Sequence, residues 1–244
     1  MQRGFGNVPQ KKNFKDSRYL KFYNDEKHAE KLLKSKNTKE AKALFLKLLK
    51  NGYKSFNIFL CLGFIELNEK NHEEAIKYFT KAKSLSKEKN LELLSGLINS
   101  YLSLGDIKEA RLVFDESINI YPNKESLIFS YAKVEEDFMN FNKAISLYEK
   151  GLKLDPRNYK ALSNLGGLYK KTNKYLNAIE IYKKAIKLKP QIAHLKVSLL
   201  TSKAFACDWS EPEYTKEILN TIDSLGQEIC PFDLLPLEDS PNNH

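Results

Sequence analysis

The sequence has few of the residues that mark fibrous, low-complexity or disulfide-bonded proteins. Among 244 residues there are only 10 glycines, 8 prolines and 3 cysteines. Collagen-like and low-complexity chains need far more Gly and Pro. The cysteines are odd in number, far apart and without a Cys-x-x-Cys pair, so they predict reduced thiols rather than a disulfide framework or a zinc site. With 42% hydrophobic and 29% charged residues, the composition is typical of a soluble globular protein.

Long hydrophobic runs are also missing. No segment approaches the roughly 20 consecutive apolar residues that a membrane-spanning helix requires. The N-terminus is charged but has no apolar stretch behind it, so a secretory signal is not expected. We therefore expect no membrane span, and cytoplasmic residence is the default expectation.

Catalytic and cofactor motifs are absent as well. The sequence has no Gly-x-Gly-x-x-Gly, Walker, His-Glu-x-x-His or Gly-x-Ser-x-Gly motif. The acidic cluster Glu135, Glu136 and Asp137 is expected to be a solvated helix face. The histidines are dispersed, with no second ligand type at metal spacing. The sequence thus predicts a chain that is not an enzyme by itself and needs no cofactor and no metal.

Arginine is scarce although the chain is basic. There are 40 basic and 31 acidic residues, a net charge of +9, and only four of the basic residues are Arg. The first 55 residues hold 15 basic and 5 acidic side chains, whereas residues 205–244 hold 1 and 9. A basic arm over residues 1–21 mixes Lys with Phe and Tyr, which can track phosphates and stack bases. Because Lys dominates and no nucleic-acid motif appears, a solvated arm is favoured over nucleic-acid binding, which stays an alternative.

What the sequence does contain is an internal repeat. An alanine followed four residues later by an aromatic residue recurs with spacings of 34, 35, 34 and 34 residues. The five pairs are Ala41/Phe45, Ala75/Phe79, Ala110/Phe114, Ala144/Tyr148 and Ala178/Tyr182. The last three of these pairs are each followed by a proline at the same period, namely Pro122, Pro156 and Pro190. Such a period predicts stacked helical hairpins, in which these aromatic residues pack between repeats rather than form a base-stacking platform.

A second helical pattern precedes each alanine, as in Leu162, Leu165, Gly166 and Tyr169. Together the two patterns resemble the tetratricopeptide repeat (TPR) family over residues 22–192. The resemblance implies an all-α solenoid, a right-handed superhelix of antiparallel helix pairs. The expected repeats are 22–55, 56–90, 91–124, 125–158 and 159–192, followed by a capping helix at 193–206.

Capping side chains are expected where each second helix begins. Asn37, Asn71 and Asp106 each stand three residues before a glutamate, the spacing of a capping box. Repeats of this kind bind partners along the groove lined by their first helices. First-helix polar residues that point away from the core predict a mixed Asn and Lys lining that could hold an extended peptide, although any single one could be merely solvated. The predicted groove residues are Asn57, Asn99, Lys133, Lys160, Asn164, Lys170 and Lys171.

The period is expected to stop after residue 206. Ser210 and Glu213 form a capping box for a short helix at about 211–225, and a proline-containing extended tail follows. This segment resembles the junction between the TPR array and the catalytic domain in bacterial O-linked N-acetylglucosamine transferase and SPINDLY-type proteins. The residues that carry the resemblance include Cys207, Asp208, Trp209, Pro231, Phe232, Asp239 and Pro241.

Three functional hypotheses follow from the sequence. The first is a scaffold that binds a protein or peptide in its groove, as the recognition part of a transferase-like protein, with a glycosyltransferase catalytic domain as a further partner. The second is a part of an active protein O-glycosyltransferase whose catalytic domain lies outside this chain. The third is nucleic-acid binding through the basic arm.

Overall fold

The described part of the chain is entirely helical in the computed structural model. The structure describes residues 17–86, 90–210, 213, 216 and 217, and in these it has eleven helices and no strand. The all-α fold is therefore confirmed. The helices are α1 (Ser17–Lys34), α2 (Thr38–Lys50), α3 (Phe56–Asn68), α4 (His72–Leu85), α5 (Leu91–Leu104), α6 (Ile107–Ile120), α7 (Glu125–Asp137), α8 (Phe141–Leu154), α9 (Tyr159–Lys171), α10 (Tyr175–Leu188) and α11 (Ala193–Phe205).

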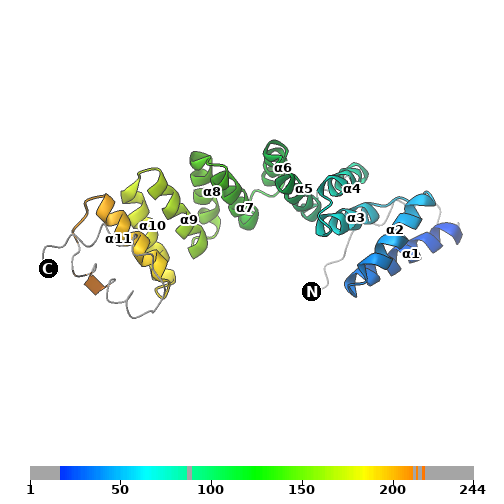
Figure 1. The fold of residues 1–244 in the computed structure, drawn as a ribbon, viewed down its shortest axis with the longest axis horizontal. Coiled ribbons are helices and arrows are strands. Elements are labelled where there is room, and N and C mark those ends of the chain that lie inside the picture. The colour runs from blue at the N-terminus through cyan, green and yellow to red at the C-terminus, as the bar shows by residue number, and fades with distance from the viewer. Residues whose placement is uncertain (1–16, 87–89, 211–212, 214–215, 218–244) are drawn as a thin grey trace. The chain divides into compact units, whose positions relative to one another are not determined.

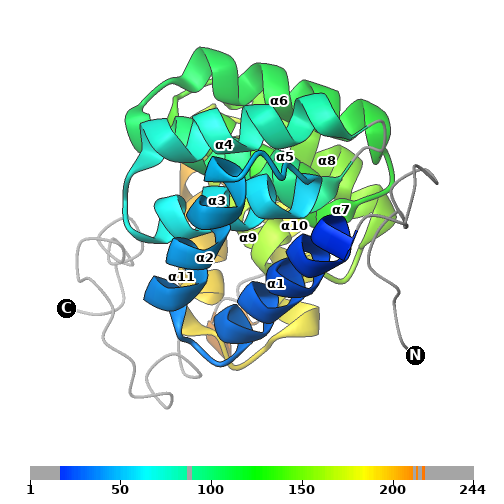
Figure 2. The same cartoon turned by 90° about the vertical axis from the view of Figure 1, so that its right-hand side faces the viewer.

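The helices form two compact units, each built from antiparallel pairs. In the first unit, which ends at Ile120, α1 packs on α2, α3 on α4, and α5 on α6. In the second unit, which begins at Tyr121, α7 packs on α8, α9 on α10, and α11 on α10. The pairs can be followed in Figure 1, and α1 to α4 are also seen from another side in Figure 2. The pairs α1–α2, α3–α4, α5–α6, α7–α8 and α9–α10 are hairpins of the predicted solenoid, and α11 follows the last of them.

Small residues let the helices approach, and aromatic residues fill the space between them. The five periodic aromatic residues are at most 3% exposed, so their predicted role in packing is confirmed. Gly63 and Gly96 both face the ring of Phe79, and a Cβ on either would lie 2.5 Å from a ring carbon. Any larger residue at these two positions would have to displace a fully buried ring.

The turn inside each of the five hairpins, and the turn that follows α11, have one geometry in the described residues. The first residue of each turn is left-handed, with φ between 52° and 76°, and its N–H donates to the carbonyl three residues back. The next N–H donates to the carbonyl five residues back, which completes a Schellman C-cap. The six left-handed residues are Lys36, Lys70, Gly105, Met139, Asn173 and Cys207. The 34-residue period therefore continues to Cys207, beyond residue 206 where the sequence pattern was expected to stop.

Two of the three expected capping side chains do not cap. Asp106 accepts a hydrogen bond from the Glu109 N–H at 3.2 Å, but Asn37 and Asn71 make no side-chain cap. Asn71 instead donates to the Glu66 carboxylate at 2.9 Å. Glu66 is buried in the position where the last repeat has a tyrosine, and a buried carboxylate needs donors more than the helix end does. The helices α2, α4 and α6 still begin where the sequence pattern places them.

The first helix begins earlier than the sequence indicates. Helix α1 starts at Ser17, so the last five residues of the expected arm at 1–21 are helical, and residues 1–16 lie outside the described part. The reason is aromatic packing, because Tyr19 and Phe22 have ring centroids 5.3 and 5.6 Å from that of Tyr53. Arg18 lies over the Phe22 ring. These aromatic residues are used within the hairpin and are not free to stack on bases.

No helix in the described ranges combines the length and the apolar character needed to cross a bilayer.

Candidate functional site

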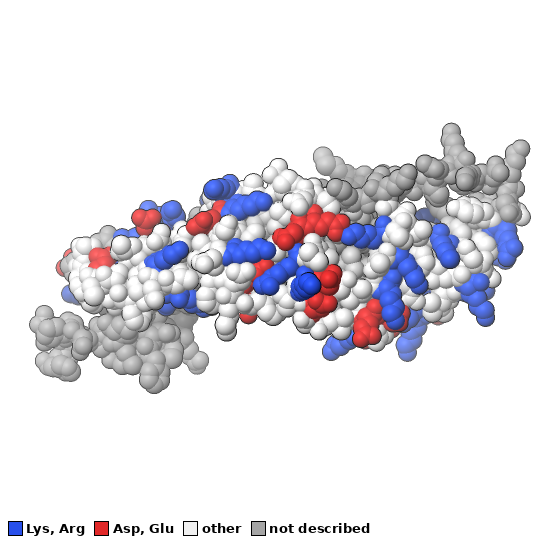
Figure 3. All heavy atoms as spheres, turned by 90° about the horizontal axis from the view of Figure 1, so that it is seen from above, with Lys and Arg blue, Asp and Glu red and all other residues white. Residues whose placement is uncertain are grey.

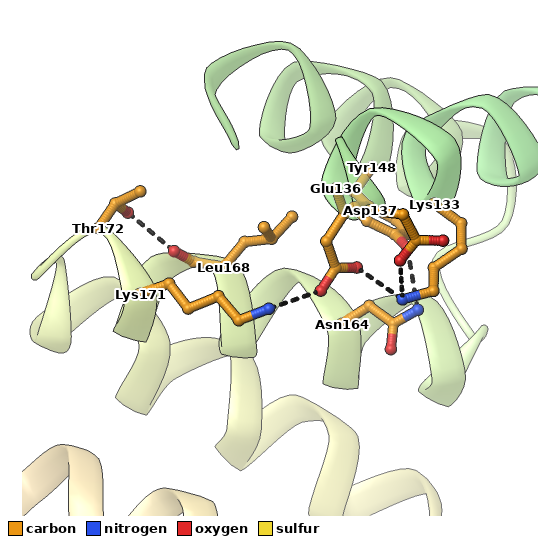
Figure 4. A network of polar contacts seen from close by, with 8 residues as sticks. All are labelled: Lys133, Glu136, Asp137, Tyr148, Asn164, Leu168, Lys171 and Thr172. Carbon is orange, nitrogen blue, oxygen red and sulfur yellow. Dashed lines mark hydrogen bonds and ion pairs between the residues drawn. The ribbon is translucent and has the colours of Figure 1, made fainter. Parts of the chain in front are cut away.

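The predicted groove residues of the second unit gather on α7 and α9, the first helices of two successive repeats. Lys133 projects from α7, and Asn164 and Lys171 project from α9 (Figure 4). Because both helices occupy the same position in their hairpins, residues at equivalent positions face the same side. We call this set of side chains, together with Glu136 and Asp137, the α7–α9 face.

Ion pairs order the lysines of the α7–α9 face. Lys133 Nζ lies 2.9 Å from Asp137 Oδ1 and 3.5 Å from Glu136 Oε2 on the same helix. Lys171 Nζ lies 3.1 Å from the other Glu136 oxygen, so this carboxylate joins α7 to α9 (Figure 4). The hydrogen bond from Lys133 to Asp137 and the two nearby carboxylates raise the pKa of Lys133. Both lysines are half exposed, so each pair contributes at most about 1 kcal/mol.

The acidic cluster on α7 is not the solvated face that the sequence suggested. Glu135 is fully buried, and the Glu136 side chain is only 11% exposed. Glu135 accepts a hydrogen bond from Asn140 at 3.0 Å and pairs with Lys143 at 3.3 Å. Burial of this carboxylate is possible because cationic and amide donors surround it. Only Asp137 is exposed as expected.

Asn164 is held in place by a tyrosine that the sequence reasoning assigned to packing alone. Its Nδ2 donates to the Tyr148 hydroxyl at 2.9 Å, while the Tyr148 ring is buried in the core. Burial raises the pKa of Tyr148 to about 12. Figure 4 shows the Asn164 Oδ1 turned away from the ion-pair network. The amide is thus oriented by the core and keeps an acceptor that no other described group uses.

The face continues from α9 to α11. Lys170 Nζ donates to the Thr201 hydroxyl at 3.1 Å, and the Ser163 hydroxyl lies 3.3 Å from His194 Nε2. Sequence reasoning missed Thr201, Glu136 and Asp137 as parts of the site. The spacing from Lys133 to Glu136 and Asp137, three and four residues on a helix, was the signal that could have found the last two.

The remaining predicted groove residues do not join this network. Lys160 lies at the start of α9, is exposed, and makes no side-chain hydrogen bond or ion pair within the described residues. Asn57 on α3 is half-buried and Asn99 on α5 is exposed, and both belong to the first unit. The structure therefore brings Lys133, Asn164 and Lys171 together.

The first three junction residues follow the end of α11, and the sixth left-handed turn begins there. Cys207 is the left-handed residue, and Asp208 accepts hydrogen bonds from the Ser210 N–H and hydroxyl. These hydrogen bonds lower the pKa of Asp208. Trp209 is 62% exposed. The other junction residues, Pro231, Phe232, Asp239 and Pro241, lie outside the described part, as does most of the expected helix at 211–225.

The described residues contain no group of three or more His, Cys, Asp and Glu side chains arranged to hold a metal ion. Burial raises the pKa of the Cys61 thiol to about 12, so this cysteine is not a thiolate near neutral pH. On the face drawn in Figure 3, Lys and Arg side chains lie among Asp and Glu side chains and uncharged residues.

Comparisons with known proteins agree with this arrangement of helical hairpins. A family model described as tetratricopeptide repeat matches residues 60–89 and 159–192. A TPR repeat-containing protein of Methanocaldococcus jannaschii is 32% identical over 105 residues. This match covers 43% of the present chain but only 18% of the archaeal protein. The class is thus a helical-repeat array, in which residues 60–89 and 159–192 match the tetratricopeptide repeat.

Solved structures show the same fold at low sequence identity. The C-terminal part of a TPR repeat-containing protein from Cytophaga hutchinsonii superposes with a TM-score of 0.70 at 19% identity, covering 82% of this chain and 78% of that one. YrrB, described as a TPR protein with an unusual peptide-binding site, superposes with a TM-score of 0.60 at 19% identity, covering 72% and 93%. Both similarities concern the fold.

Proposed function

We propose that this chain is a protein–protein interaction scaffold that binds a protein or peptide segment in the groove lined by its first helices. The observation that carries the proposal is the Asn164 amide, which the Tyr148 hydroxyl orients while its Oδ1 stays available. An extended peptide presents backbone N–H groups that such an oxygen can accept. Because the amide is already oriented, binding would cost little side-chain entropy.

The surrounding ion pairs support the same proposal. Lys133 and Lys171 are held by Glu136 and Asp137, so the two lysines flank Asn164 in defined positions. A bound partner would contact lysines that are already ordered by ion pairs, so binding would cost less side-chain entropy than with free lysines. The description of YrrB as a TPR protein with a peptide-binding site supports this kind of ligand by analogy.

The proposal is tested with peptides selected from a randomised library on the wild-type protein. Their dissociation constants are then measured by calorimetry for wild type, Asn164→Ala and Tyr148→Phe. We expect Asn164→Ala to weaken binding by about tenfold, the loss of about 1.4 kcal/mol. Tyr148→Phe keeps the amide but releases its orientation, so a smaller loss is expected.

Lys174→Ala provides the control, because Lys174 is exposed in the α9–α10 turn and belongs to no part of the α7–α9 face. It should leave the affinity within about twofold of wild type. Selected peptides that bind Asn164→Ala as tightly as wild type would contradict the proposal, as would a selection that enriches no peptide.

We infer a narrower second role from the junction motif, as the recognition part of an O-linked N-acetylglucosamine transferase-like protein. The observation that favours it is Trp209, a large apolar side chain left 62% exposed beside the end of α11. Such a residue is suited to docking a further domain. Adding the catalytic domain of such a transferase in trans should raise the melting temperature of this chain, and Trp209→Ala should abolish the rise. The role is refuted if neither a shift nor a complex is observed.

A further inference from the structure

Positive charge is concentrated at the edge of the second unit where each hairpin passes to the next. Helix α8 ends at Leu154 and α9 begins at Tyr159, so four residues separate these two ends. The antiparallel α9–α10 pair brings the end of α10 to the start of α9, and Lys189 Nζ lies 5.8 Å from the centre of the Tyr159 ring. We call the cations at these three helix ends the basic edge. They are Lys150, Lys153, Arg157, Lys160, Lys184, Lys187 and Lys189, all exposed.

The basic edge has almost no acidic counterpart. Asp155 lies between α8 and α9, and its Oδ1 accepts a hydrogen bond from the Arg157 N–H at 3.3 Å. Glu149 on α8 instead accepts a hydrogen bond from Tyr169, near the opposite end of α9. Within the described residues, none of the basic-edge side chains has an ion pair or a hydrogen bond, and Lys189 only lies over the Tyr159 ring. The edge thus carries largely uncompensated positive charge.

Three lysines at the opposite edge of the same unit are paired with carboxylates. Lys133 and Lys171 pair with Glu136, and Lys143 pairs with the buried Glu135. The two edges therefore differ. Lysines at the α7–α9 face form ion pairs with carboxylates, whereas the cations of the basic edge do not. Clustered like charges repel one another, so the basic edge favours an anionic partner.

Helix stability accounts for only part of the basic edge. Lys153 and Lys187 lie in the last turns of α8 and α10, where a cation interacts favourably with the helix dipole. Arg157 and Lys160 lie at the start of α9, where the dipole disfavours a cation, and the first turn of α9 has no acidic residue. These two cations oppose local helix energetics, which is expected of residues retained for a partner.

The chemistry of the edge favours carboxylates over nucleic acid. Arg157 is its single arginine, whereas bidentate phosphate recognition favours several. Its aromatic residue, Tyr159, is half-buried and lies beneath Lys189, so no ring is free to stack on a base. We infer that the basic edge binds an acidic, Asp- and Glu-rich segment of a partner protein, at a surface distinct from the α7–α9 face. Three adjacent helix ends span about 16–20 Å, the length of about six extended residues.

The test measures the affinity of a fluorescent octaglutamate peptide by anisotropy at low salt, with Lys153→Glu/Arg157→Glu as the test variant. Its matched control is Lys34→Glu/Lys174→Glu. In each double variant, one substituted lysine lies in the last turn of a helix, Lys153 in the test and Lys34 in the control. The other substituted cation, Arg157 or Lys174, lies just before the start of a helix. Each double variant lowers the net charge of the protein by four. Both variants leave the groove residues unchanged, so a failure here is separate from a failure of groove binding.

We expect the test variant to weaken octaglutamate binding at least tenfold and the control less than threefold, with wild-type binding lost at high salt. If circular dichroism shows that the test variant is unfolded, Lys153→Gln/Arg157→Gln replaces it, with about a threefold loss expected. Equal losses in the test and control variants would refute the proposal. The proposal would also be refuted if a single-stranded oligonucleotide of equal charge bound as tightly as octaglutamate. It would likewise be refuted if octaglutamate did not bind to wild type, which is the result expected if the acidic residues 205–244 occupy the edge.

Discussion

Neighbouring glycines in α9 differ in what surrounds them. A Cβ on Gly166 would lie 2.8 Å from two carbons of the buried Tyr182 ring, whereas the nearest atom to a Cβ on Gly167 would be the Tyr182 hydroxyl at 3.8 Å. The first position requires glycine because a ring occupies the space, and the second has room for a methyl group. One helix therefore contains a glycine needed for packing and one that only weakens the helix.

We expect Gly166→Ala to lower the free energy of unfolding by about 1–3 kcal/mol, the usual cost of overpacking. Gly167→Ala should raise it by up to about 1 kcal/mol, because alanine is the better helix former. Urea denaturation of the two variants measures both effects. Similar changes in the two variants would show that the Tyr182 ring does not limit the space at Gly166.

Glu66 links stability to pH. Burial alone would raise its pKa, but the hydrogen bonds from Asn71 and Lys42 outweigh burial and lower it. A carboxyl whose pKa is lower in the folded state stabilises the fold at all pH values above its unfolded pKa of about 4.3. That stabilisation is lost as the pH falls through the folded value.

Wild type should therefore lose more stability between pH 6 and pH 3.5 than Glu66→Gln, which has no proton to bind at this site. Urea midpoints at the two pH values measure the difference. The control is Glu73→Gln, an exposed position in α4, which should follow wild type. An identical pH dependence in wild type and Glu66→Gln would contradict the role of this carboxylate.

At the scale of the element, the hairpin turn keeps its backbone while its side chains vary. Lysine, glycine, methionine, asparagine and cysteine all occupy its left-handed position, although glycine and asparagine suit it best. Met139 adopts this left-handed conformation although it has a Cβ, and its side chain is 78% exposed. The hydrogen bonds of the turn and the packing of the two helices must outweigh the strain.

Met139→Gly should raise the free energy of unfolding by about 0.5–1 kcal/mol, because glycine adopts positive φ without a Cβ clash. Met139→Ala keeps the Cβ and should give no such gain. Thermal denaturation of both variants separates relief of strain from loss of the methionine side chain. A stabilising Met139→Ala would point to the exposed side chain as the cause.

Sequence predicted the helices better than the site. The alanine and aromatic periods located five helix pairs, because packing between repeats requires a small and a large residue at fixed positions. The period was not followed to Cys207, since the turn is made by backbone hydrogen bonds and has no residue signature. The orientation of Asn164 and the burial of Glu135 were also not predicted. Both depend on contacts between two helices, and the spacing of residues along one helix gives no information on such contacts.

At the scale of the whole molecule, hairpins within each of the two units are stabilised mainly by their neighbours in sequence. Helical-repeat stability is approximately a sum of repeat and nearest-neighbour terms. Phe45 is fully buried in a core with residues from α1, α2 and α3. A cavity at this position should therefore act locally.

Phe45→Ala should lower stability by about 3–5 kcal/mol where its contacts lie. Native-state hydrogen exchange should show the largest loss of protection in α1, α2 and α3, and the smallest in α9 and α10. A uniform loss along the chain would mean that the molecule unfolds as one cooperative unit.

The sixth left-handed turn also bears on how such an array can change in length. Every turn closes through the same two backbone hydrogen bonds, whichever side chain occupies its left-handed position. If a block of 34 residues were duplicated or deleted, the turns on either side of the change would therefore keep the same geometry. Growth by whole repeats then needs no new loop, and the residues on the first helices can diverge without altering the register. An array of this kind can acquire a new binding surface by copying a hairpin it already has.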